Sequence, residues 1–172
     1  MRSVAFAGLV AWGLLVGCSG EPPQPDRLTG DELARIPVLE PGKIGALLES
    51  HKGKVVVLVV WSVRREACVA MYPQLGTLSG GGAEPVVIAV NIDRVDDVRN
   101  KVLPLLDEHQ PKFLNRICRA GPDALAAFVD PRWMGQVPAL AVYDRAGRRV
   151  AAFMGEDALA QLKGRLPKLL KR

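Results

Sequence analysis

The sequence is poor in the side chains that most often carry chemistry. Its 172 residues include three cysteines and two histidines, and neither His51 nor His109 stands at a spacing from a second ligand that zinc or copper sites use. We therefore expect no metal and no other cofactor. The glycine run at 80–82 follows an expected helix and lacks a trailing Lys-Ser or Lys-Thr pair, which excludes the usual phosphate-binding loop.

A strong excess of one charge is also missing. The formal net charge is +5, and the basic residues alternate with acidic ones except in the tail at 163–172. We expect no nucleic-acid partner, although an anionic surface near the tail stays open. Hydrophobic residues make up 49% and charged residues 24%, as in globular domains, and the length fits one such domain.

No apolar run is long enough to span a bilayer. The run from Val4 to Val16 has 13 residues, follows Arg2 and ends just before Gly17-Cys18. A hydrocarbon core of about 30 Å needs more, so the run is typical of an export signal.

The residues at its end, Leu15-Val16-Gly17-Cys18, resemble the bacterial lipobox, in which the chain is cut before the cysteine and the thiol carries lipid. We expect residues 1–17 to be a lipoprotein signal peptide and Cys18 to be lipidated. The protein would then be held on a membrane of the cell envelope, facing the periplasm or the exterior. An ordinary signal peptide with a chance cysteine is the alternative.

Residues 18–43 separate the expected anchor from the body. Prolines at 22, 23 and 25 predict an extended tether, and Pro37 and Pro41 interrupt any long helix in the stretch that follows. We interpret 27–42 as covering structure.

From residue 44 onward the pattern alternates between helices and strands. Apolar β-branched runs predict buried strands, helical spacing predicts helices, and a turn at 144–147 predicts a hairpin. The expected strands are 55–61, 85–92, 113–118, 139–143 and 148–154, and the expected helices begin near 44 and cover 66–78, 95–106, 123–129 and 156–170. The sum is an α/β domain over 44–172, with a partly parallel sheet and one antiparallel hairpin.

Three stretches in this order carry a family resemblance: residues 53–62, Cys68 with Pro73 five positions on, and residues 137–148. Together they resemble the thioredoxin fold, and more narrowly the TlpA-like branch of membrane-tethered thiol-disulfide oxidoreductases. The resemblance implies a three-layer sandwich, a central mixed sheet with helices on both faces. It also implies that the Val137-Pro138 bond is cis and faces the active-site turn. A trans proline that opens a strand is the alternative.

The active-site motif of that family is incomplete here. Such proteins carry Cys-X-X-Cys at a helix start, where the first thiol attacks and the second resolves the mixed disulfide. When the motif is aligned on Trp61 and Pro73, Cys68 takes the second position and Arg65 the first. Exchange between two thiols of the motif is therefore excluded. Arg64 and Arg65 also place two positive charges at the helix start.

Three roles stay open for Cys68. It is an inert buried side chain, a monothiol activated by the nearby arginines, or one half of a disulfide with Cys118.

Two functions follow from these alternatives. The first is a non-catalytic envelope module that binds an extended segment of an exported protein or peptide between the helix start and Pro138, with Trp61, Trp133 and Met134 as candidate apolar contacts. For Trp61, filling the core is the simpler interpretation. The second is a TlpA-like thiol-disulfide oxidoreductase that uses Cys68 alone or with Cys118.

Overall fold

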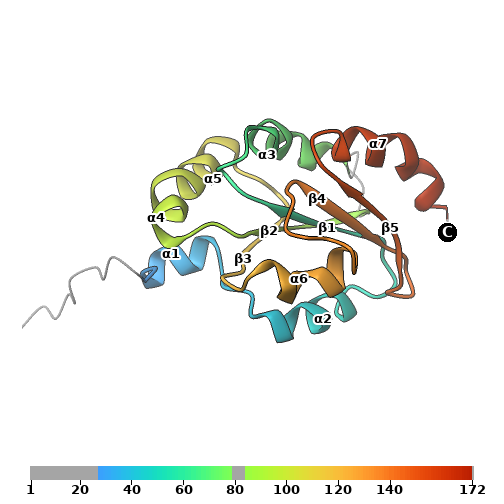
Figure 1. Cartoon of the computed structure of the whole chain (residues 1–172), viewed down its shortest axis with the longest axis horizontal. Coiled ribbons are helices and arrows are strands. Elements are labelled where there is room, and N and C mark those ends of the chain that lie inside the picture. Colours follow the sequence, from blue (N-terminus) through green and yellow to red (C-terminus); the bar gives the residue numbers. More distant parts are fainter. Residues whose placement is uncertain (1–26, 79–83, 172) are drawn as a thin grey trace, which may run out of the picture.

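The computed structural model describes residues 27–78 and 84–171, which form a sheet between two layers of helices (Figure 1). The expected signal peptide and Cys18 lie outside the described residues. The five strands lie in the order β3-β2-β1-β4-β5. Their bounds are β1 Val56–Trp61, β2 Val86–Asn91, β3 Leu114–Ile117, β4 Ala139–Tyr143 and β5 Arg149–Met154. The first three strands are parallel, and β4 is antiparallel to both β1 and β5.

Helices cover both faces of this sheet. One face carries α3 (Glu66–Met71), the 3-10 helix η1 (Tyr72–Thr77), α4 (Val95–Asp97), the π-helix η2 (Val98–Val102), α5 (Leu103–His109) and α7 (Ala158–Leu169). The other carries α2 (Pro41–Glu49) and α6 (Pro122–Val129), while α1 (Gly30–Arg35) lies beside α4 and α5 (Figure 1). The expected three-layer arrangement with a mixed central sheet is confirmed. None of the helices in the described part has the length and apolar character to cross a membrane.

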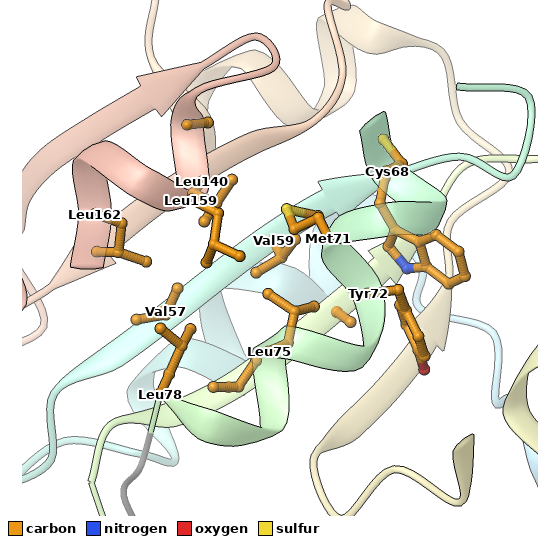
Figure 2. Packing of buried hydrophobic residues seen from close by; sticks show 14 of the residues in the cluster. Val57, Val59, Cys68, Met71, Tyr72, Leu75, Leu78, Leu140, Leu159 and Leu162 are labelled. Carbon is orange, nitrogen blue, oxygen red and sulfur yellow. The ribbon is translucent and has the colours of Figure 1, made fainter. Parts of the chain in front are cut away.

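Strand β1 runs through the middle of the core. All six of its residues are buried, because apolar side chains on both of its faces meet a helical layer. Val57 and Val59 pack under α3 and α7 (Figure 2), whereas Leu58 faces α2 and α6. Burying each such side chain contributes roughly 1.5–3 kcal/mol, so this strand holds the two apolar clusters together.

Two expected helices are interrupted at prolines. The helix predicted over 66–78 changes to 3-10 geometry after Met71, next to Pro73. The helix predicted over 95–106 contains a π segment that ends just before Pro104. A proline lacks the N–H of the helical ladder and its ring clashes with the carbonyl four residues earlier, so the backbone changes its hydrogen-bonding period there.

Residues 36–39 join the body through the edge of the sheet. Ile117 donates its N–H to the Pro37 carbonyl over 3.1 Å and accepts from the Leu39 N–H over 2.8 Å. Ile36 and Leu39 are buried in the two apolar clusters. The stretch interpreted as covering structure is thus packed on the domain itself.

Candidate functional site

The turn between β1 and α3 places Arg65 and Cys68 in opposite environments. Arg65 is exposed at the N-cap of α3, with φ −115° and ψ 116°, and Cys68 lies in the first turn, donating its N–H to the Arg65 carbonyl over 2.9 Å. The Cys68 side chain is 0% exposed and belongs to the apolar cluster under α3 (Figure 2). The position that faces solvent therefore carries a guanidinium, and the sulfur lies inside.

Burial raises the pKa of the Cys68 thiol to about 11. The charge of Asp93 acts in the same direction, and a backbone hydrogen bond from Ser62 together with the charge of Arg65 opposes it. The thiol is thus protonated at neutral pH, whereas attack on a disulfide requires an accessible thiolate. In this conformation Cys68 has the properties of a structural side chain.

The predicted alternative of a Cys68–Cys118 disulfide is wrong for this fold. Both cysteines are free and buried, but they belong to different apolar clusters. Cys68 packs on the α3 and α7 face of the sheet, and Cys118 packs on the α2 and α6 face. The sheet itself separates the two sulfur atoms.

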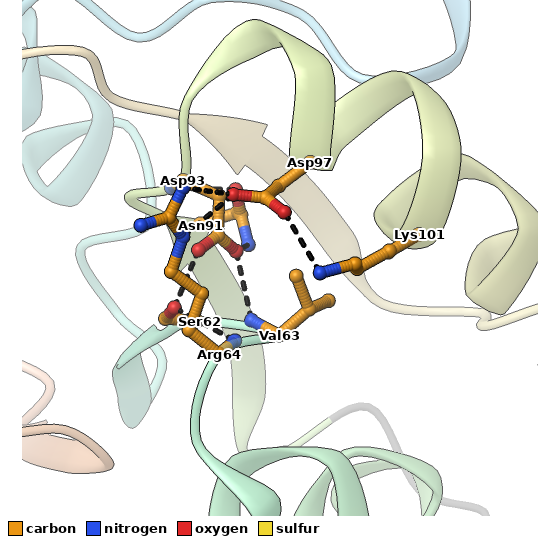
Figure 3. Close-up of polar contacts among 7 residues, drawn as sticks. All are labelled: Ser62, Val63, Arg64, Asn91, Asp93, Asp97 and Lys101. Carbon is orange, nitrogen blue, oxygen red and sulfur yellow. Dashed lines mark hydrogen bonds and ion pairs between the residues drawn. The ribbon is translucent and has the colours of Figure 1, made fainter.

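A buried carboxylate fixes the turn, and the sequence analysis did not identify it. Asp93, 5% exposed, follows β2 and accepts from the Ser62 hydroxyl, from the Val63 N–H over 2.8 Å and from the Asn91 side-chain amide over 2.6 Å (Figure 3). The Asp93 N–H returns a bond of 3.0 Å to the Asn91 side chain. Because β1 and β2 are parallel, their carboxyl ends meet at one edge of the sheet. Polar residues within two positions of the strand ends, Ser62 after β1 and Asp93 after β2, were the available signal.

A second carboxylate, that of Asp97, binds Arg64. Arg64 Nε donates to Asp97 Oδ2 over 2.6 Å, and Lys101 Nζ lies 3.0 Å from Asp97 Oδ1 (Figure 3). Hydrogen bonds from Lys101 and from Arg64 lower the pKa of Asp97. Arg64 is thus engaged with α4, whereas Arg65 forms no ion pair with any residue in the described ranges.

The Val137-Pro138 peptide bond is cis, as the resemblance implies. Since β4 pairs Ala139 with Val60, the buried Pro138 lies beside the end of β1, at the same edge of the sheet as the Arg65 turn. Its carbonyl accepts from the Gly155 N–H over 3.0 Å. The main chain of Val137, by contrast, has no hydrogen-bond partner among the residues that the structure describes.

The loop before Val137 is braced by side chains. Trp133 is buried and donates its Nε1–H to the Gln136 carbonyl over 2.6 Å, and the Met134 N–H donates to Gln136 Oε1 over 3.1 Å. Met134 itself is 84% exposed. The sequence analysis offered Trp133 and Met134 as contacts, and only Met134 presents its side chain to solvent.

Trp61 lies in the core. It is 0% exposed and stacks against Tyr72 with ring centroids 4.3 Å apart. Its Nε1 atom is buried with no partner within the described part of the chain. Trp61 therefore packs in the core at the end of β1, next to the turn that carries Arg65, and does not line the protein surface.

The described residues contain no cluster of three histidine, cysteine or carboxylate side chains able to hold a metal ion.

Neither a protein-family model nor a curated protein matches the sequence. Solved structures do. A DsbF homologue from Corynebacterium diphtheriae matches with a TM-score of 0.59 at 21% identity, over 71% of this chain and 76% of its own. A thiol-disulfide isomerase from Corynebacterium glutamicum matches with a TM-score of 0.58 at 23% identity, over 72% and 85%. The protein has a thioredoxin-like fold.

A third thioredoxin-like structure is a secreted disulfide oxidoreductase of Mycobacterium tuberculosis, with a TM-score of 0.50 at 20% identity, over 70% of this chain and 86% of its own. At these identities the likeness establishes the fold alone.

Proposed function

We propose that this protein is a lipid-anchored envelope module with a thioredoxin-like fold that binds an extended segment of an exported protein without redox catalysis. It is a degenerate relative of thiol-disulfide oxidoreductases. The observation that carries the proposal is the pairing of an exposed Arg65 with a fully buried, protonated Cys68.

The chemistry of that pair supports loss of thiol exchange. Two-thiol exchange needs an attacking thiolate at the exposed end of the motif and a second sulfur to resolve the mixed disulfide. Arg65 has no sulfur, and Cys118 lies across the sheet from Cys68. A mixed disulfide formed at Cys68 would therefore have no resolving thiol from this chain's described residues.

The geometry around Pro138 supports binding. An extended peptide laid beside Val137 would exchange hydrogen bonds with its free N–H and C=O groups, as in strand addition. Met134, on the loop before Val137, offers an exposed apolar contact, and Arg65, on the turn after β1, offers a cation without an ion pair within the described structure. The main chain of the loop and of the turn is already held by hydrogen bonds, so little backbone ordering is needed on binding.

Location at the envelope is supported by the apolar run at 4–16 and the lipobox-like residues up to Cys18. The secreted thioredoxin-like relative agrees with an exported setting. A Cys18→Ser variant should leave the membrane fraction when cells expressing the full chain are fractionated. If that variant stayed in the membrane fraction like the wild type, the lipid anchor would be rejected.

The absence of catalysis is tested by measuring the disulfide reductase activity of three proteins that comprise residues 27–172. They are the wild type and the variants Cys68→Ser and Cys118→Ser. We expect no turnover in any of the three proteins. Turnover in the wild type that disappears in Cys68→Ser and persists in Cys118→Ser would overturn the proposal and establish a monothiol enzyme.

Binding is tested in the cell envelope with a photo-reactive amino acid placed at Met134 or, as the control, at the exposed Lys168 of α7. We expect an adduct from the Met134 position that the Lys168 position does not give. Identical adducts from both positions would contradict a specific binding surface beside Pro138.

A further inference from the structure

The sheet ends at β3, and only half of this edge is covered. Residues 37–39 pair with the last residue of the strand, Ile117, through the two hydrogen bonds given above. The chain reaches this segment from α1, which does not pair with the strand. The first half of β3, from Leu114 to Asn115, has no neighbouring strand on this side.

The side of the strand to which the N–H and C=O groups of Asn115 point can be deduced from the hydrogen bonds of Ile117. Along a strand the N–H and C=O groups of alternate residues point to the same side. Ile117 bonds outward to residues 37 and 39, whereas Cys118 bonds inward, donating to the Asn91 carbonyl over 2.8 Å. Asn115, two residues before Ile117, therefore directs its N–H and C=O outward. Within the described part of the chain, its N–H has no acceptor.

A groove of about 400 Å³ lies over this open half. Its walls come from the end of α1 with Pro37 and from the end of α5 with Gln110, and its floor is residues 113–116. The groove thus opens onto a strand edge between two helix ends, and Asn115, which is 9% exposed, is one of its lining residues. An unpaired strand edge is the template on which an extended segment can pair.

The charges in the groove select the kind of segment. Arg35 is neutralised by Asp107 at 2.5 Å. Arg116 has no ion pair with a described residue and donates its Nη1–H to the Asn115 carbonyl over 2.7 Å. A carboxylate entering the groove would bond to this guanidinium more strongly than a carbonyl does. The guanidinium would then release the Asn115 carbonyl to the main chain of the incoming segment.

We propose that the open half of β3 is a second binding surface, which takes an extended segment with acidic side chains as an added strand. The Asn115 N–H and C=O supply the main-chain hydrogen bonds, and Arg116 pairs with a carboxylate. The surface is separate from the one beside Pro138, so either can exist without the other.

The test uses residues 27–172 and a fluorescein-labelled peptide of alternating valine and glutamate, with a valine–lysine peptide for comparison. Fluorescence anisotropy should show saturable binding of the glutamate peptide only. Arg116→Glu should weaken this binding at least about tenfold, the effect of losing one charge-assisted contact. The matched control Lys168→Glu changes the net charge equally on α7, which packs on β4 and β5 at the opposite side of the sheet from β3, and should bind like the wild type.

Amide hydrogen exchange gives a second, site-specific measurement. The Asn115 amide should exchange more slowly when the glutamate peptide is bound. The proposal is overturned if binding does not saturate below about 1 mM, or if Arg116→Glu and Lys168→Glu weaken it equally. Protection at Val137 and not at Asn115 would assign the peptide to the surface beside Pro138. A concentration-dependent dimer protected at Asn115 would assign this edge to a second copy of the chain.

Discussion

The Val63 main-chain N–H donates to the Asp93 carboxylate over 2.8 Å, although 30 residues separate them in the sequence. The same carboxylate accepts from the Ser62 hydroxyl. The turn that carries Arg65 is therefore fixed to the end of β2 by hydrogen bonds to one buried side chain. This fixation holds the turn without a disulfide.

The first prediction concerns that carboxylate. Asp93→Asn should lower the free energy of unfolding by about 2–4 kcal/mol, because an amide nitrogen would replace an acceptor that faces buried donors. Urea unfolding measures the change. The control is Asp96→Asn at a neighbouring exposed acid, which should alter stability by less than about 0.5 kcal/mol. Equal effects of the two substitutions would show that the Asp93 hydrogen bonds do not hold the turn.

The second prediction concerns a sulfur atom introduced at position 65. Arg65→Cys places an exposed thiol at the start of α3, three residues before Cys68. We expect the variant to form an intramolecular disulfide and to have more disulfide reductase activity than the wild type, because the turn and the cis Pro138 are already in place. Thiol titration and turnover check this. Arg64→Cys, one position away, should gain no activity, and equal gains in both variants would argue against a preserved scaffold.

The third prediction concerns the Cys68 thiol, whose pKa is raised to about 11. At pH 8 the native protein should react with iodoacetamide at Cys68 much more slowly than the unfolded protein does. The thiol of the unfolded protein ionises near pH 8.5, whereas the native thiol ionises only near pH 11. The free energy of unfolding should therefore fall as the pH rises from about 8.5 to about 11.

Comparison with Cys68→Ala isolates this contribution from that of Tyr72, whose burial also raises its pKa. The difference in unfolding free energy between the wild type and Cys68→Ala should shrink as the pH rises through this range. A difference that stays constant with pH would show that the native thiol ionises like a free one.

The fourth prediction concerns the ion pair that docks α1. The hydrogen bond from Arg99 to Glu32, at 2.6 Å, is the main cause that lowers the pKa of Glu32 to about 2. Glu32 also completes the capping box with Thr29. Its contribution is present above the ordinary pKa near 4.5 and disappears as the pH falls toward 2.

Glu32→Gln should therefore destabilise the protein by about 1 kcal/mol at pH 7 and have little effect near pH 2. Thermal unfolding at both pH values measures this. The control Asp31→Asn changes an exposed neighbouring acid and should be neutral at both. A Glu32→Gln effect that does not diminish at low pH would exclude the charge as its source.

The central part of the fold was predictable because its signals are local. The apolar run at 55–61 contains β1, and the turn at 144–147 gives the hairpin of β4 and β5. The terminal helix begins at Ala158, later than the predicted 156, because Gly155 still has a positive φ of 87°. The segment at 36–39 was not predictable as part of the sheet edge, because its partner Ile117 is remote in sequence.

Some features of the candidate site were also predictable from local sequence, and others were not. The cis Pro138 was predictable from the resemblance of short motifs, and the same motifs predict that Arg65 stands at the first position of the active-site motif. The depth of Cys68 and the role of Asp93 depend on how β1, β2 and α3 pack, and that packing is set by residues spread over the chain. For Trp61, the simpler of the two interpretations is confirmed, because its side chain fills the core against Tyr72.

The sheet that keeps Cys68 apart from Cys118 has a practical consequence for the living cell. These two sulfurs need no oxidising catalyst during maturation, and reductants have no bond between them to cut. The described domain should therefore keep the same shape in oxidising and in reducing surroundings. Ligand capture at either surface should be equally strong with and without dithiothreitol.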